Sequence, residues 1–186
     1  LQKIRNGFLD PDDWGKLGLA SMKLSNSEIN IADLPNVNVL EIRAIARRLK
    51  AAGKLDMIII DYLQLIRGSS SKGDNRQQEI SEISRALKGI ARELDVPVIA
   101  LSQLSRAPEM RADRRPMLSD LRESGAIEQD ADMVIFLYRD DYYNEETEKK
   151  NIAEVIIAKH RSGSVGTVEL LWLSNYTKFA NIDRYR

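Results

Sequence analysis

Apolar residues recur along the chain at two spacings, one typical of helices and one typical of buried strands. Helical spacing covers residues 11–24, 39–52 and 76–95. In the third segment, apolar residues follow one another at steps of three and four, which places them on one face of a helix. They are Ile80, Ile83, Leu87, Ile90 and Leu94. We therefore predict a long helix with a single apolar stripe, which Pro97 ends.

Polar residues in front of two of these segments are typical of helix starts. Asp10 stands before a proline and two further acids, a combination that favours the first turn of a helix. Asn38 and Glu41 have the spacing of a capping box. Residues 1–6 resemble the tail of another helix, which Gly7 can end.

Short apolar runs predict the strands. Residues 57–60 are apolar without alternation, which is typical of a strand buried on both faces in a parallel sheet. Residues 54–103 then form one strand–helix–strand unit with parallel strands and a right-handed crossover. Further strands are expected at 133–138, 152–158, 167–173 and 176–182, and a short one around Ile29 and Ile31. The expected fold class is α/β, with a mostly parallel central sheet flanked by helices and a carboxyl-terminal antiparallel hairpin.

Three connecting segments have compositions of their own. Residues 68–75, GSSSKGDN, are low in complexity and predict a mobile loop. Residues 104–116 are polar and rich in arginine, and we expect a loop there as well. Ser119 or Asp120 is expected to cap a short helical turn that runs to Gly125. Residues 159–166, KHRSGSVG, contain glycines that permit a tight turn between two strands.

Composition narrows the class of protein. The chain of 186 residues is 43% hydrophobic and 30% charged, as ordinary globular domains are, and we expect one domain. It has 28 basic and 28 acidic residues, so nucleic-acid binding would have to come from a local loop or an assembly. It has no cysteine, which excludes disulfides and thiolate metal sites and fits a reducing cytoplasm. No apolar run has the length of a membrane span, and no signal peptide is expected.

Polar residues follow the predicted strands where open α/β sheets bind ligands. Asp61 comes directly after the apolar run 57–60, the pattern of a Walker-B acid that helps to hold Mg²⁺. Gln103 follows the next strand and can sense a γ-phosphate or orient water. Lys159 and Arg161 lie two apart, so on an extended segment both point the same way and can meet charge on a phosphate. We expect these groups to gather at one edge of the sheet.

Each of these residues also has a purely structural interpretation. Asp61 can be a turn acid after a core strand, and Gln103 can cap the turn that follows it. Lys159 and Arg161 can be solvated charges of a hairpin. For Asp61 alone the two interpretations have equal weight, and for Gln103 and the two cations taken singly the structural one is favoured. The combination in one α/β chain favours a phosphate site.

Four long stretches of the chain carry a specific pattern: MIIIDYLQLI, NRQQEISEISRALKGIARELDVPVIALSQLSR, RRPMLSDLRESGAIEQDADMVIFLYRDDYY and IIAKHRSGSVGTVEL. They resemble the carboxyl-terminal, RecA-like motor domain of bacterial replicative DNA helicases of the DnaB type. The resemblance implies a RecA-like P-loop NTPase core. It also implies an enzyme that couples ATP hydrolysis to 5′-to-3′ translocation on single-stranded DNA and unwinds duplex at the replication fork.

The resemblance also implies roles for individual residues. Asp61 matches the Walker-B acid, with Mg²⁺ held through water, and Gln103 matches a switch glutamine that senses phosphate. Lys159 and Arg161 match a pair that acts in trans on the nucleotide of the neighbouring subunit. The single histidine, His160, alternates with that pair, so we assign it no catalytic role.

The resemblance places DNA contacts on one loop, at Arg122, Glu123 and Gly125. An arginine supplies a charged donor, and a glycine lets backbone N–H groups approach phosphate. Phosphate repels a glutamate, so Glu123 is expected to order the loop rather than touch DNA.

The resemblance further implies ATP and Mg²⁺ as cofactors, a homohexameric ring, a primase and a helicase loader as partners, and a cytoplasmic location. The sequence contains no G-x-x-x-x-G-K-[ST] loop, and it starts with Leu1. We therefore expect a fragment of a motor domain that lies after the phosphate-binding loop, without activity of its own. Two alternatives stay open: another RecA-like ATPase, such as a strand-exchange protein, or an isolated fragment that serves as an interaction module.

Overall fold

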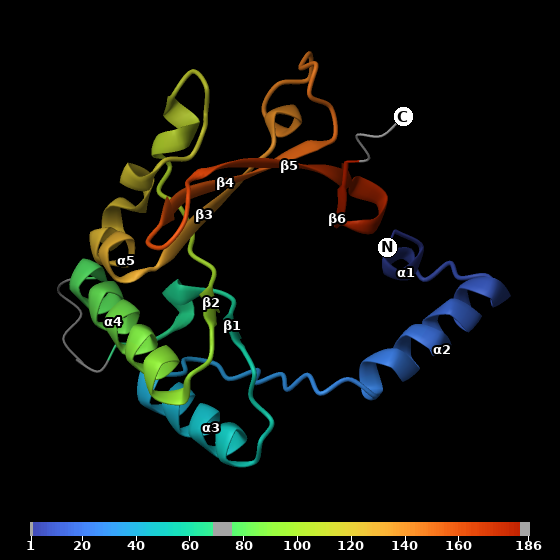
Figure 1. Cartoon of the computed structure of the whole chain (residues 1–186). Coiled ribbons are helices and arrows are strands. Elements are labelled where there is room, and N and C mark those ends of the chain that lie inside the picture. Colours follow the sequence, from blue (N-terminus) through green and yellow to red (C-terminus); the bar gives the residue numbers. More distant parts are fainter. Residues whose placement is uncertain (1, 69–75, 183–186) are drawn as a thin grey trace. The chain divides into compact units, whose positions relative to one another are not determined.

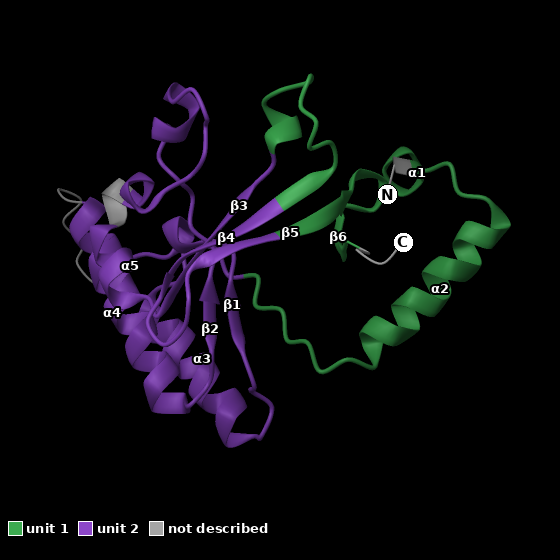
Figure 2. Cartoon of the chain, turned by 45° about the horizontal axis from the view of Figure 1, so that its top comes forward, with its two compact units in different colours: residues 1–33, 140–153, 169–186 green, residues 34–139, 154–168 purple. Residues whose placement is uncertain are grey.

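The computed structural model describes residues 2–68 and 76–182, without the side chains of Gln2 and of residues 122–124. The predicted mobile loop therefore lies, except for Gly68, outside the described residues. The chain divides into two compact units (Figure 2). Unit 1 comprises residues 1–33, 140–153 and 169–186, and unit 2 comprises residues 34–139 and 154–168. Within the described ranges, no helix is both long and apolar enough to cross a membrane.

Unit 2 carries a parallel strand pair covered by helices (Figure 1). Strands β1 (Ile58–Ile60) and β2 (Val98–Ala100) are parallel, with Ile59 opposite Ile99. Helix α3 (Val39–Ala51) precedes β1 in the chain, and helix α4 (Arg76–Leu94) lies between β1 and β2. The predicted strand–helix–strand unit is thus confirmed. So is the capping box, in which Asn38 Oδ1 accepts from the N–H of Glu41 at 3.0 Å.

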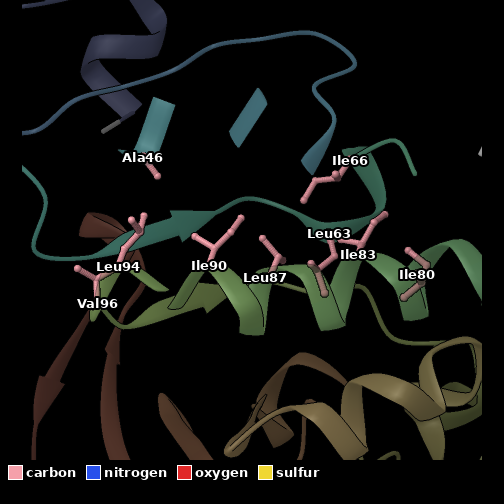
Figure 3. Packing of buried hydrophobic residues seen from close by; sticks show 9 residues of the cluster. All are labelled: Ala46, Leu63, Ile66, Ile80, Ile83, Leu87, Ile90, Leu94 and Val96. Atoms are coloured by element: carbon pink, nitrogen blue, oxygen red, sulfur yellow. The ribbon is translucent and has the colours of Figure 1, made fainter. Parts of the chain in front are cut away.

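The apolar stripe of α4 supplies five of the nine buried residues in the larger hydrophobic cluster of unit 2 (Figure 3). All five residues predicted for the stripe are buried, and they pack with Ala46 of α3 and with Leu63 and Ile66, which follow β1. Ile58, Ile60, Val98 and Ala100 of the two strands pack against the same cluster. The 3.6-residue period therefore identified the main contact of the fold, because a helix buries one stripe against a sheet.

Burial of β1 on both faces is a prediction that the structure contradicts. Ile59 is 65% exposed and Ile99 is 48% exposed, whereas their neighbours along each strand face the core. In the described chain, α3 and α4 cover one face of the pair, so alternate residues of each strand point to the uncovered face.

The remaining strands form an antiparallel sheet in the order β3-β4-β5-β6. Their bounds are β3 (Met133–Tyr138), β4 (Ile152–His160), β5 (Gly166–Leu173) and β6 (Lys178–Asn181). Strand β3 pairs with β4, with a register shift between Val134 and Ile135. The α/β class and the carboxyl-terminal antiparallel strands are confirmed, and the antiparallel sheet also includes β3.

Short helical elements link the strands of unit 2. They are the 3₁₀ helices η1 (Leu63–Leu65), η2 (Ala107–Met110) and η3 (Leu118–Ser124), and helix α5 (Gly125–Asp130). The predicted cap of η3 is wrong in detail. Met117 precedes its first residue, and Asp120 is the third residue of the turn, whose side chain accepts from the N–H of Met117. Gly125 starts α5 instead of ending the turn.

Unit 1 contains helices α1 (Gln2–Asn6) and α2 (Pro11–Ser25), the 3₁₀ helices η4 (Asp140–Tyr142) and η5 (Ser174–Tyr176), and strand β6 (Figure 2). Gly7 ends α1 with a φ of 74°, as predicted. Asp10 caps α2 as predicted, and its Oδ1 accepts from the N–H of Asp13 at 2.8 Å. The strand predicted around Ile29 and Ile31 is absent from the described residues. Ile31 is 88% exposed, and alternation alone cannot form a strand without a partner to pair with.

Candidate functional site

The parallel pairing of β1 and β2 brings two of the predicted site residues together. Asp61 follows β1, and Gln103 lies three residues after β2 ends. The ladder continues past both strands, because the N–H of Leu101 donates to the carbonyl of Ile60 and the N–H of Leu63 donates to that of Leu101, each at 2.9 Å. The carboxyl ends of the two strands therefore lie side by side, where α/β sheets bind ligands.

The sequence reasoning missed Gln64, whose side chain fixes the backbone at Gln103. Gln64 Nε2 donates to Ser102 Oγ at 3.1 Å and to the carbonyl of Gln103 at 3.4 Å. Gln64 Oε1 accepts from the N–H of Gln103 at 3.3 Å. An amide on η1 that both donates and accepts thus joins the segments after the two strands. In the sequence, only the position of Gln64, three residues after Asp61, points to a role near the site.

The side chains of Asp61 and Gln103 face solvent. Within residues 2–68 and 76–182, neither the Asp61 carboxylate nor the Gln103 carboxamide makes a hydrogen bond or ion pair, so both can receive a ligand. The described part of the chain contains no group of three metal-ligating side chains. A single aspartate suits Mg²⁺, which keeps several waters and binds through one or two carboxylates together with substrate phosphates.

Lys159 and Arg161 extend from β4 and from the residue after it toward the end of α5. Lys159 Nζ donates to the carbonyls of Glu128 and Gln129, and Arg161 Nη2 donates to that of Gln129. Both cations thus reach the same carbonyl, which confirms that they point the same way. Carbonyls at the end of a helix carry partial negative charge, which favours cations there.

Asp132 anchors the same region. Its Oδ1 lies 3.4 Å from Arg161 Nη1, its backbone carbonyl accepts from the N–H of Arg161 at 2.9 Å, and its carboxylate accepts from Lys88 of α4. The ammonium of Lys88, with a smaller contribution from Arg161, lowers the pKa of Asp132. Arg161 is therefore held by charge as well as by hydrogen bonds.

His160 lies over the turn of the β4–β5 hairpin. Its Nδ1 accepts from the N–H of Ser162 at 3.2 Å, and a Cβ built at Gly163 would lie 2.9 Å from its Nε2. The ring therefore supports the turn.

The expectation that all four predicted side chains gather at one edge of one sheet is wrong. Asp61 and Gln103 lie at the end of the parallel pair, whereas β4 belongs to the antiparallel sheet and its two cations bind residues 128–132. Among the described residues, no hydrogen bond joins the two groups. Residue spacing places side chains within one element, but it cannot tell which sheet a strand joins.

Two arginines of the segment before η3 form ion pairs with buried carboxylates. Arg111 binds both oxygens of Asp120, with Nη1 at 2.8 Å from Oδ1 and Nη2 at 2.5 Å from Oδ2. The Arg111 guanidinium lowers the pKa of Asp120, and Asp120 in turn raises the pKa of Arg111. The sequence reasoning took Arg111 as part of a polar loop, and no local pattern marks its partner.

A second arginine of the same segment binds β4. Arg115 Nη1 donates to Glu154 Oε1 at 3.2 Å, and its guanidinium lies 4.9 Å from the centre of the Tyr138 ring. The Tyr138 hydroxyl donates to the carbonyl of Asp113 at 3.0 Å. The carboxylate of buried Glu154 raises the pKa of Arg115. Of the predicted DNA contacts, the side chains of Arg122 and Glu123 lie outside the described residues, and Gly125 begins α5.

A parallel strand pair that ends in an exposed acid and an exposed amide, backed by helices and followed by an antiparallel sheet, defines an ATPase-type α/β domain. Solved structures with this fold agree. The chain is similar to a solved "ATPase Domain" with a TM-score of 0.92 and 55% identity, over 98% of this chain and 65% of that one. It is equally similar, with a TM-score of 0.92 and 54% identity, to "The Structure Of A DnaB-Like Replicative Helicase And Its Interactions With Primase", over 98% of this chain and 44% of that one.

The family described as "DnaB-like helicase C terminal domain" matches residues 1–181, and the chain belongs to this family. It is 62% identical to "Replicative DNA helicase DnaB" of Geobacillus stearothermophilus and 64% identical to "Replicative DNA helicase DnaC" of Bacillus subtilis (strain 168). Each match covers 98% of this chain, and the chain spans 40% of the length of each relative. The resemblance that the sequence motifs indicated is confirmed.

Proposed function

We propose that this chain is part of the motor of a hexameric replicative DNA helicase. The helicase couples ATP hydrolysis to 5′-to-3′ translocation on single-stranded DNA and unwinds duplex at the replication fork. The observation that carries this proposal is the family match over residues 1–181 together with the adjoining positions of Asp61 and Gln103 at the ends of β1 and β2. Residues 1–186 then belong to one motor domain.

In this proposal the end of the parallel pair faces the nucleotide. ATP with Mg²⁺ would supply the phosphate chemistry, and Asp61 would help to hold the metal through water. Gln103 contacts the γ-phosphate through its carboxamide. Gln64 holds the Gln103 backbone and so fixes the position from which the Gln103 side chain reaches the phosphate.

Lys159 and Arg161 act in this proposal on the nucleotide of a neighbouring subunit. Two cations that share one direction can stabilise the charge that develops on a transferring phosphoryl group. Both now donate to neutral backbone carbonyls at the end of α5, and Arg161 also pairs with the carboxylate of Asp132. A phosphate competes well with such carbonyls because hydrogen bonds between ions are stronger than those to neutral groups.

The turn at residues 122–125 contacts single-stranded DNA in this proposal. Arg122 donates to phosphate, the backbone N–H of Gly125 approaches it, and Glu123 orders the turn. Six copies in a ring would hold the strand largely without regard to sequence. A primase and a helicase loader are the proposed partners, and the protein acts in the cytoplasm.

Subunit mixing tests this proposal in the hexameric protein that contains the chain. Arg161→Ala should abolish DNA-stimulated ATP hydrolysis while nucleotide binding stays. Asp61→Ala should also be inactive, but a mixture of the two variants should regain part of the activity, because some interfaces then combine an intact Asp61 with an intact Arg161. His160→Gln is the matched control, since it changes the residue between the two cations and keeps an acceptor for Ser162. Normal turnover by Arg161→Ala would refute the role in trans.

A further inference from the structure

The start of η3 is held by an ion pair that the proposed function leaves unused. Asp120 is only 1% exposed, and each of its carboxylate oxygens is bound. Oδ1 accepts from Arg111, and Oδ2 accepts from Arg111 and, at 2.7 Å, from the N–H of Met117. The backbone carbonyl of Asp120 also accepts from the N–H of Ser105 at 3.1 Å, two residues after Gln103.

The next residue fixes the turn from the other side. Leu121 is buried and forms a cluster with Val134 and Phe136 of β3. Residues 120 and 121 therefore have fixed positions immediately before Arg122. The backbone that follows two anchored residues starts from a fixed point, because only a few backbone dihedrals separate it from them.

The ion pairs continue to β4, the strand that carries Lys159 and ends directly before Arg161. Arg111 Nη2 donates to the carbonyl of Arg115 as well as to Asp120, and Arg115 pairs with Glu154 of β4. The buried carboxylates of Asp120 and Glu154 thus connect the turn to the antiparallel sheet through two guanidinium groups. Arginine suits this task, because its planar fork binds two oxygens at once with a defined direction.

We propose that Arg111 and Asp120 are positioning residues for DNA binding: their ion pair holds residues 122–125 where they can contact the phosphate backbone. This inference rests on the proposed function. Asp120 is buried with both oxygens occupied, and both terminal nitrogens of Arg111 are taken up by Asp120 and the carbonyl of Arg115, so the pair is assigned no DNA contact of its own. A buried ion pair is a poor source of net stability because desolvation offsets its attraction, so a gain in geometry is a better reason for its presence.

The test replaces Asp120 by asparagine in the hexameric protein. The Oδ2 atom faces two donors, Arg111 Nη2 and the Met117 N–H, and an asparagine can offer only one oxygen to the three donors. Asp113→Asn is the matched control. It removes a carboxylate that lies 4.0 Å from the same guanidinium and is largely exposed.

We expect Asp120→Asn to raise the Kd for a fluorescent oligo-dT strand, and the KM for DNA in stimulated ATP hydrolysis, about tenfold. Hydrolysis without DNA, nucleotide affinity and hexamer formation should stay within about twofold of wild type, and Asp113→Asn should match wild type throughout. A purely structural role would instead lower all of these activities together. Arg111→Lys, which keeps the charge but not the fork, should weaken DNA binding in the same direction and serves if Asp120→Asn does not fold.

Wild type and Arg122→Ala distinguish a failure of the proposed DNA contact from a failure of the positioning role. If wild type binds no single-stranded DNA, or Arg122→Ala binds it normally, the proposed DNA contact fails. If Arg122→Ala loses affinity while folded Asp120→Asn and Arg111→Lys bind DNA as wild type does, the positioning role is overturned and the DNA contact stands. Equal losses of DNA-free hydrolysis and DNA affinity in both variants would also overturn it.

Discussion

Ile90→Ala removes the side chain at the middle of the contact between α4 and the parallel strands. Ile90 is 1% exposed and lies in the cluster that contains Leu87 and Leu94 on the same helix (Figure 3). The substitution deletes three buried carbon atoms and leaves a void, because neighbouring helical residues are held by their own contacts.

The expected loss can be worked from the side chain. Three buried carbons at about 0.8 kcal/mol each contribute about 2.4 kcal/mol of transfer free energy. The cavity that remains adds to this, so we expect the free energy of unfolding to fall by about 3 kcal/mol, within the range known for such substitutions. For a chain of this size the midpoint of thermal unfolding should fall by about 6–12 °C.

The assay is urea and thermal unfolding followed by far-ultraviolet circular dichroism, which reports the helices. Tryptophan fluorescence is unsuited, because Trp14 and Trp172 both lie in unit 1. The matched control is Arg85→Ala, which truncates an exposed residue of the same helix and should change stability by no more than about 0.5 kcal/mol. A loss below about 1 kcal/mol for Ile90→Ala, or an equal loss for Arg85→Ala, would refute the packing described for α4.

Two further predictions concern the cap of α3 and the response to acid. Asn38→Ala removes the acceptor for the Glu41 N–H and should lower the free energy of unfolding by about 1 kcal/mol, measured by the same unfolding experiments; no change would mean that the cap is not formed in solution. The pKa of Asp120 is lowered by Arg111, so its contribution to stability is present above the ordinary aspartate pKa and is lost as the pH falls through the folded-state value. Thermal midpoints measured from pH 7 down to pH 3 should therefore drop less steeply for Asp120→Asn than for wild type, and parallel curves would contradict the ion pair.

Local patterns predicted the helices well. The stripe from Ile80 to Leu94 repeats at the helical period, so a helix places all its side chains on one face, where they are buried together. Capping by Asp10 and by Asn38 was also predictable, because a cap is satisfied within four residues of chain.

Predictions were less complete for residues whose contacts lie far away in the sequence. Ile29 and Ile31 alternate as a strand does, yet no described strand pairs with them. Asp120 was predicted as a cap, but Arg111 occupies its carboxylate from nine residues away. Lys159 and Arg161 were placed correctly relative to each other and wrongly relative to Asp61, because the sheet that β4 joins depends on β3.

The sequence by itself determined the family, the helices, the parallel strand pair and the residues that stand at the strand ends. Those properties depend on runs of neighbouring residues, whose periods and motifs are readable without a structure. Only the tertiary structure decided that Gln64 braces Gln103 and that Arg111 and Arg115 bind the buried carboxylates of Asp120 and Glu154. Such pairs join residues up to 39 positions apart, and hydrogen bonds and charge attraction act through space, so the spacing along the chain does not reveal them.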